Sequence, residues 1–72
     1  MTVAMTYSEA FFLFLSELRN EARLQGICLH ASAIIFASDV FKKTVQSKGI
    51  PNAATIEEIA KRWVARLCTS QF

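Results

Sequence analysis

The sequence predicts an all-α fold, a compact three-helix bundle, from three observations. The segments "TYSE" at residues 6–9 and "TIEE" at residues 55–58 place a glutamate three residues after a threonine, the spacing of a capping box at a helix start. The chain has only two glycines and one proline, and they stand where helices would end. Apolar residues form 53% of the chain and recur at helical spacing. We expect helices over about residues 7–25, 27–48 and 56–69.

The first predicted helix, residues 7–25, begins after a Thr6 cap and ends before Gly26, which supplies the left-handed residue common at a helix end. One apolar stripe runs along it, as expected for a helix that packs on one side. The members of this stripe are Tyr7, Phe11, Phe14, Leu15, Leu18 and Ala22. Phe12, Leu13 and Leu24 fall outside it. We expect residues 1–5 to be a flexible N-terminus and residues 6–70 to form a single domain.

The second predicted helix, residues 27–48, is apolar around most of its circumference and stops at Gly49 and Pro51. One stripe consists of Ile27, Ala31, Ile34, Phe41 and Val45, and another of Leu29, Ala33, Phe36 and Val40. A helix with so wide an apolar surface is buried on more than one side. We expect it to be either the central helix of the bundle or the floor of an interface.

The third predicted helix, residues 56–69, begins after a Thr55 cap and resembles an ordinary outer helix. Its apolar stripe consists of Ile56, Ile59, Ala60, Trp63, Val64 and Leu67. On its polar side, Glu57 precedes Lys61 and Glu58 precedes Arg62 by four residues, the favourable order for ion pairs within a helix.

Residues that could carry chemistry are few. His30 is the only histidine, and Cys28 lies two positions away, so the two side chains would point apart on a helix. With Cys68 they are still one ligand short of a closed zinc site unless a carboxylate or another subunit helps. No glycine-rich phosphate loop and no unassigned carboxylate pair is present. We expect no enzymatic activity, no metal and no cofactor.

The distribution of apolar and charged residues also bears on location. The longest apolar run, residues 10–15, is far shorter than the about 20 residues that span a bilayer. No lysine or arginine precedes Arg19, so the basic region of a secretory signal is missing. Two cysteines do not make the disulfide framework of a small secreted domain. We expect an intact cytoplasmic protein that does not enter a membrane.

Six apolar residues remain after the core is assigned, and they predict an interface. They are Phe12, Leu13, Leu24, Leu29, Phe36 and Val40. Contiguous apolar patches commonly mark interaction sites, and a short chain gains stability by oligomerising. We therefore predict a homodimer that acts as a small protein-binding regulator, adaptor or inhibitor. A phage or mobile-element accessory protein that blocks a host or defence complex would fit this size. The alternative is that these side chains fold back into the core.

A second functional hypothesis uses the basic residues. Its candidate contacts to nucleic acid or to an acidic partner are Arg19, Arg23, Lys61, Arg62 and Arg66. The formal net charge of +2 is small for a nucleic-acid-binding domain, and the basic residues are dispersed along the chain. A dimer that gathered them into one composite basic face would be needed, so this hypothesis is second to protein binding.

Overall fold

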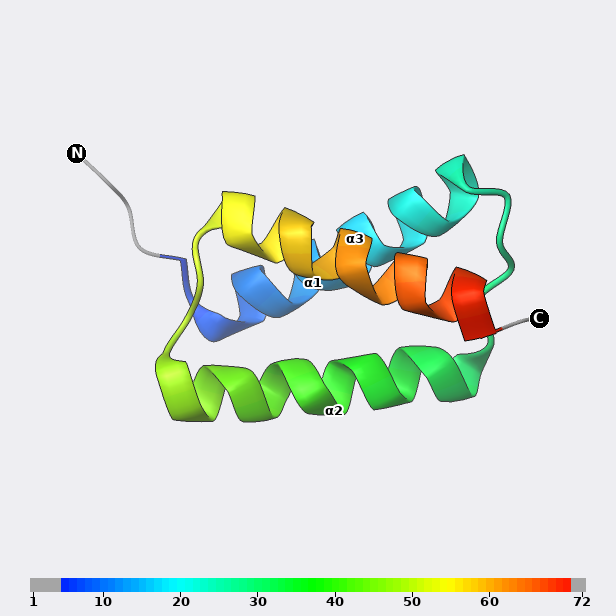
Figure 1. The fold of residues 1–72 in the computed structure, drawn as a ribbon. Helices are drawn as coiled ribbons and strands as arrows, with labels where there is room; N and C mark the ends of the chain where they lie inside the picture. The colour runs from blue at the N-terminus through cyan, green and yellow to red at the C-terminus, as the bar shows by residue number, and fades with distance from the viewer. Residues whose placement is uncertain (1–4, 71–72) are drawn as a thin grey trace.

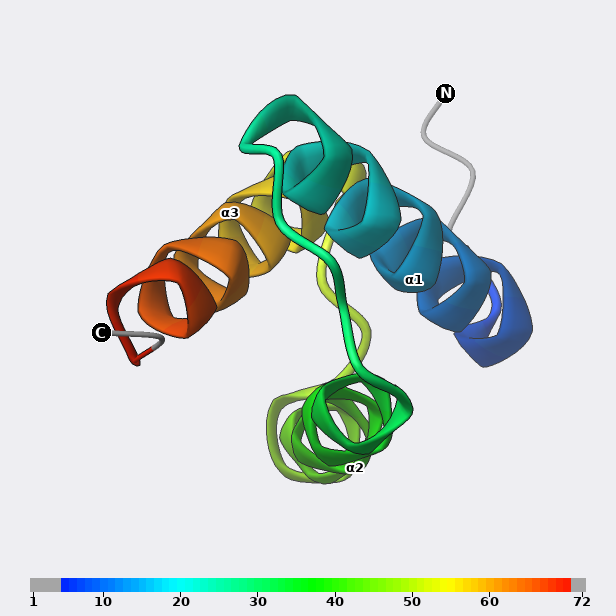
Figure 2. The ribbon, with the colours of Figure 1, turned by 90° about the vertical axis from the view of Figure 1, so that its right-hand side faces the viewer.

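The computed structural model describes residues 5–70, and side chains as far as residue 67. Within that range the chain forms three helices and no strand: α1 (Tyr7–Leu24), α2 (Ala31–Lys48) and α3 (Ala53–Ser70). The all-α, three-helix prediction is confirmed. In Figure 1, α1 and α3 cross above α2, and Figure 2 shows α2 end-on beneath the V that α1 and α3 form. Most of the predicted N-terminal segment, residues 1–4, lies outside the described residues.

The predicted capping box begins α1. The Thr6 backbone N–H donates to Glu9 Oε1 at 2.9 Å, and the Glu9 backbone N–H donates to Thr6 Oγ1 at 3.2 Å. The bond from the backbone of Thr6, followed by the bond from its hydroxyl, holds the pKa of Glu9 below its ordinary value of 4.5. The sequence predicts this capping box correctly because both of its residues lie within four positions of the chain.

The end of α1 explains why α2 begins four residues later than predicted. Gly26 has a φ of +70°, its N–H donates to the Arg23 carbonyl at 3.1 Å, and the Ile27 N–H donates to the Ala22 carbonyl at 2.8 Å. This pair of bonds is a Schellman motif. Because Ile27 belongs to it and packs against the core, it cannot start the next helix. Residues 27–30 form the connection, and the predicted start of the second helix at residue 27 is wrong.

The start of α3 also differs from the prediction. The Thr55 backbone N–H donates to Asn52 Oδ1 at 2.8 Å, so Asn52 caps the helix. Thr55 lies inside the first turn, and the expected capping box between Thr55 and Glu58 does not form. Asparagine is at least as good an N-cap as threonine, and it follows Pro51, which cannot donate a backbone hydrogen bond.

The core lies mainly between α1 and α3, the pair of helices in closest contact. Its fully buried members are Ala10, Phe14, Leu18 and Ala22 of α1 and Ile56, Ala60 and Val64 of α3. All except Ala10 belong to the predicted stripes. Three of the seven are alanines, and small side chains allow two helix backbones to approach closely.

Helix α2 is therefore not the central helix. It contributes only Ala37 and Phe41 to the fully buried core. The Phe41 ring stacks on Phe14 with a centroid distance of 4.5 Å and lies 6.2 Å from the ring of Phe11. Because the rings of Phe41, Phe14 and Phe11 fill most of this contact, α2 stands farther from its neighbours than α1 and α3 stand from each other.

Candidate functional site

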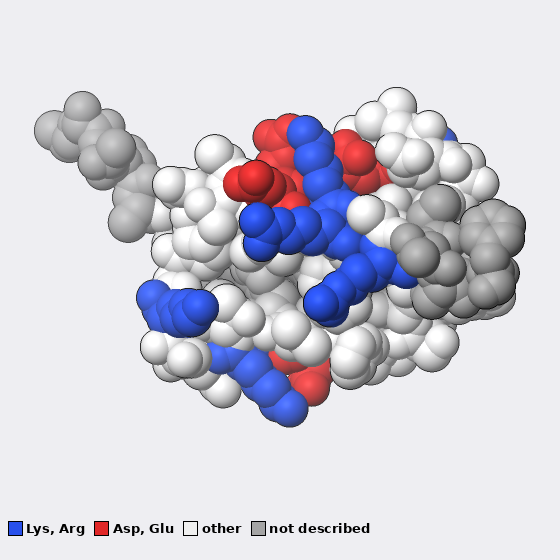
Figure 3. Space-filling model, in the orientation of Figure 1, with Lys and Arg blue, Asp and Glu red and all other residues white. Residues whose placement is uncertain are grey.

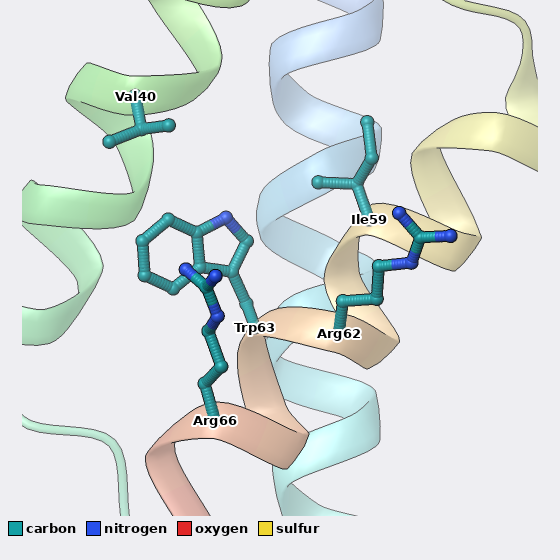
Figure 4. A pocket seen from close by; sticks show the side chains of 5 residues that line it. All are labelled: Val40, Ile59, Arg62, Trp63 and Arg66. Carbon is teal, nitrogen blue, oxygen red and sulfur yellow. The ribbon is translucent and has the colours of Figure 1, made fainter. Parts of the chain in front are cut away.

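A hollow of about 250 Å³ lies between α2 and α3. It is lined by Val40 of α2 and by Ile59, Arg62, Trp63 and Arg66 of α3 (Figure 4). We call it the α2–α3 groove. It exists because the backbones of α2 and α3 make few close approaches, in contrast to those of α1 and α3.

The apolar part of the groove centres on Trp63. Figure 4 shows its indole extending from α3 toward Val40 on α2. On α2, the Phe36 ring meets the indole edge-to-face, with a centroid distance of 5.5 Å and an interplanar angle of 88°. This is a favourable geometry for two aromatic rings. Phe36 nevertheless remains 60% exposed, so apolar surface continues out of the groove onto α2.

The polar wall of the groove is formed by Arg62 and Arg66. Figure 4 shows both side chains extending from consecutive turns of α3, near Ile59 and Trp63. Neither guanidinium forms an ion pair with a carboxylate among residues 5–67. The pair between Glu58 and Arg62 that the sequence predicts is therefore not formed. Two guanidinium groups without an ion pair in the described part of the chain thus lie beside an apolar floor.

Lys61, next to Arg62 in sequence, has different surroundings. Its Nζ lies 3.3 Å from Glu57 Oε1, as the sequence predicts. The hydrogen bond to Glu57, the charge of Glu57 and then the charges of Glu21 and Glu17 on α1 raise the pKa of Lys61 above its ordinary value of 10.5. Lys61 is thus compensated by acidic neighbours. In Figure 3 acidic and basic side chains mix over the upper part of the view, where α1 and α3 lie, and further basic side chains extend below them toward α2.

A second hollow, of about 430 Å³, lies at the end of α1. Its lining consists of Arg19, Ala22, Arg23, Gly26, Ile27, Cys28 and Leu29. It shares no residue with the α2–α3 groove. The five predicted basic contacts are thus divided: Arg62 and Arg66 line one hollow, Arg19 and Arg23 line the other, and Lys61 has acidic neighbours.

The six predicted interface residues are also divided. Phe36 and Val40 meet at the α2–α3 groove. Phe12 and Leu24 are 73% and 70% exposed but line neither hollow. Leu13 and Leu29 are partly buried against the core, as the alternative hypothesis expects.

Sequence reasoning missed two residues of the groove and one exposed apolar residue outside it. Ile59 and Trp63 were assigned to the core, but they are only partly buried and line the groove. Ile35, which lies outside both predicted stripes of α2, is 68% exposed. Its position beside the predicted stripes was the one signal that could have identified it.

The described residues contain no cluster of three or more side chains of the metal-ligating types His, Cys, Asp and Glu. Cys28 is an exposed free thiol, and the side chain of Cys68 lies outside the described part of the structure. Between residues 5 and 70, no helix combines the length and the hydropathy needed to cross a bilayer.

No protein-family model matches this chain, and no curated protein or solved structure matches it either. A functional inference therefore depends on the geometry and chemistry of the α2–α3 groove.

Proposed function

We propose that this chain is a small non-enzymatic protein-binding regulator, adaptor or inhibitor, and that the α2–α3 groove with Phe36 is its binding surface. The observation that carries the proposal is the aromatic pair of Phe36 and Trp63, which lies at the open edge of the groove instead of in the core. Arg62 and Arg66 border this pair. Aromatic residues and arginine are the types most enriched where protein interfaces gain their binding energy.

The size of the surface sets the expected strength of binding. Covering one large apolar side chain completely contributes about 1.5 to 3 kcal/mol, and association costs about 4 kcal/mol or more. Since Val40, Ile59 and Trp63 are already partly covered, the groove alone supports modest affinity. Such affinity suits a reversible regulator. A phage or mobile-element accessory protein that blocks a host or defence complex would use a surface of this kind.

The proposal includes a cytoplasmic homodimer. Phe12 and Leu24 lie outside the groove, so two copies that pair through these side chains leave the groove open for another protein. Light scattering across a concentration series tests this part. A mass of one chain at every concentration contradicts the dimer and leaves the binding proposal standing.

The binding proposal is tested by affinity capture from an extract of the source cells with three versions of the chain. Phe36→Asp places a charge at the groove. Ile35→Asp is the matched control, because Ile35 is the adjacent residue, is similarly exposed and lies about 100° around the helix. Circular dichroism should show equal helicity for all three.

We expect a protein that is retained by the wild type and by Ile35→Asp and lost with Phe36→Asp. In a titration, the captured protein, once purified, should bind the wild type and Ile35→Asp more tightly than Phe36→Asp. If its retention does not depend on Phe36, the groove is not the binding surface and the proposal is wrong.

A further inference from the structure

We infer that the partner contributes an acidic amphipathic helix, which lies along the α2–α3 groove with its carboxylates against Arg62 and Arg66. This inference rests on the proposed function and specifies the chemistry of the partner. It follows from the spacing of the groove residues, from the state of the two arginines and from the distribution of the other charges.

The first argument is the spacing. Three pairs of residues four positions apart border the groove: Phe36 with Val40, Ile59 with Trp63, and Arg62 with Arg66. Each pair is separated by about 6 Å along its helix axis. A helical partner presents its own side chains at the same interval. One apolar row can therefore meet the floor while an adjacent acidic row meets the arginines, as in other complexes that seat a helix in a groove.

The second argument is the availability of charge. Two other helical cations of this chain already have carboxylate partners: Lys61 binds Glu57, and Lys43 lies 3.4 Å from Asp39. Arg62 and Arg66 have none among the described residues. A guanidinium accepts a carboxylate in a two-pronged arrangement, so these side chains are suited to acidic residues of a partner.

The third argument favours a protein segment over nucleic acid. Beyond the two arginines, Lys61 is surrounded by Glu57, Glu21 and Glu17, and Arg19 and Arg23 line the other hollow. Arg62 and Arg66 thus form a short row of positive charge beside apolar surface. The other cations without an ion pair in the described part of the chain, Arg19, Arg23, Lys42 and Lys48, do not line this groove. A duplex needs cations that follow its phosphates over a longer path.

The inference can be tested with a phage-displayed library of random peptides of about 16 residues, long enough for about four helical turns. The library is selected on the full chain after depletion on Phe36→Asp. We expect the retained sequences to combine apolar residues at helical spacing with Asp or Glu one turn apart.

Selected peptides are then synthesised and titrated, with Trp63 fluorescence and calorimetry as readouts, since Trp63 is the only tryptophan. The test variant is Arg62→Ala with Arg66→Ala. Its matched control is Arg19→Ala with Arg23→Ala, another arginine pair four residues apart that borders the other hollow. Loss of two charge pairs should weaken binding about tenfold in the test variant and leave the control unchanged.

The possible outcomes separate this inference from the proposed function. Peptides without an excess of Asp or Glu, or peptides that bind both double variants equally, overturn the acidic partner but keep the groove as a protein-binding surface. A selection that yields no Phe36-dependent peptide overturns the inference, while the capture experiment decides the function separately. Binding of duplex DNA that needs Arg62 and Arg66 but tolerates Phe36→Asp overturns both.

Discussion

Phe14 of α1 and Phe41 of α2 form a nearly parallel stack, with ring centroids 4.5 Å apart and planes inclined by 6°. Both side chains are fully buried. Because Phe41 is the only large side chain of α2 that is buried completely within the described residues, this stack is the main attachment of α2 to the rest of the bundle.

Truncation of this stack should be severe. Phe14→Ala or Phe41→Ala is expected to lower the free energy of unfolding by about 3–5 kcal/mol. A chain of 72 residues has about 4–11 kcal/mol in total, so either variant will be close to unfolded. Urea denaturation followed by circular dichroism measures the loss. Ser16→Ala, at an exposed position of α1, is the control and should change stability by less than about 0.5 kcal/mol. An unchanged midpoint for Phe41→Ala would contradict the packing described here.

Charge introduced into the core and on the surface should have opposite consequences. Leu18 is 1% exposed, so Leu18→Asp leaves a carboxylate without water or a partner, and the chain should unfold. Phe12→Asp should retain helicity and weaken self-association. Trp63→Asp should fall between the two, because the indole is only partly buried. Circular dichroism and light scattering distinguish the three, and equal unfolding of all would place Phe12 in the core.

The N-cap of α3 can be tested with two substitutions that should affect stability differently. Asn52→Ala removes the acceptor for the Thr55 N–H and should cost about 1 kcal/mol. Thr55→Ala should be neutral or slightly stabilising, because alanine is the better residue inside an exposed helical turn. Thermal melting of the two variants measures this difference. If Thr55→Ala lost more stability than Asn52→Ala, Thr55 and not Asn52 would be the N-cap.

The capping box of α1 should make stability depend on acidic pH. The pKa of Glu9 is lower in the folded chain than its ordinary value of 4.5, so its contribution is present above that value and is lost as pH falls through the folded-state pKa. Between about pH 6 and about pH 3, the wild type should therefore lose more stability than Glu9→Gln, which cannot ionise. Urea titrations across this range measure the difference, and identical pH profiles would show that the box does not act through the charge.

The residue after α2 should tolerate only glycine. Gly49 has φ +87° and ψ 179°, a conformation that is essentially restricted to glycine. A Cβ there would meet no atom within 4 Å, so the cost of Gly49→Ala comes from the backbone alone. We expect a loss of about 1–3 kcal/mol in a denaturation experiment. Ser47→Ala is a nearby exposed control that should change little.

The features that sequence predicted correctly are local or periodic. The capping box of Thr6 and Glu9 involves neighbours in the chain, and Leu18, Ile56 and Val64 followed from helical spacing alone. The predicted starts of α2 and α3 are wrong because, at each place, neighbouring residues favour two different helix boundaries. Ile27 could begin a helix or complete a Schellman motif, and Asn52 competed with Thr55 for the cap.

The groove could not be predicted because it depends on how far apart two helices stand. Ile59 and Trp63 lie on the apolar side of α3, and a helical wheel does not tell whether α2 covers them. Whether α2 covers these side chains depends on the alanines at the contact of α1 with α3 and on the aromatic rings at the contacts of α2. The separation of Arg19 from Arg62 has the same origin, since their relative positions follow from the arrangement of all three helices.

The attachment of α2 through Ala37 and Phe41 also ranks the parts of the bundle by local stability. An excursion that detaches α2 while α1 and α3 stay paired costs less free energy than global unfolding, so amide hydrogens of α2 should exchange with solvent sooner than those buried between α1 and α3. Each such excursion widens the groove beside Trp63. The width of the groove therefore varies, and a partner that binds the packed state, in which α2 is attached, will slow amide exchange in α2.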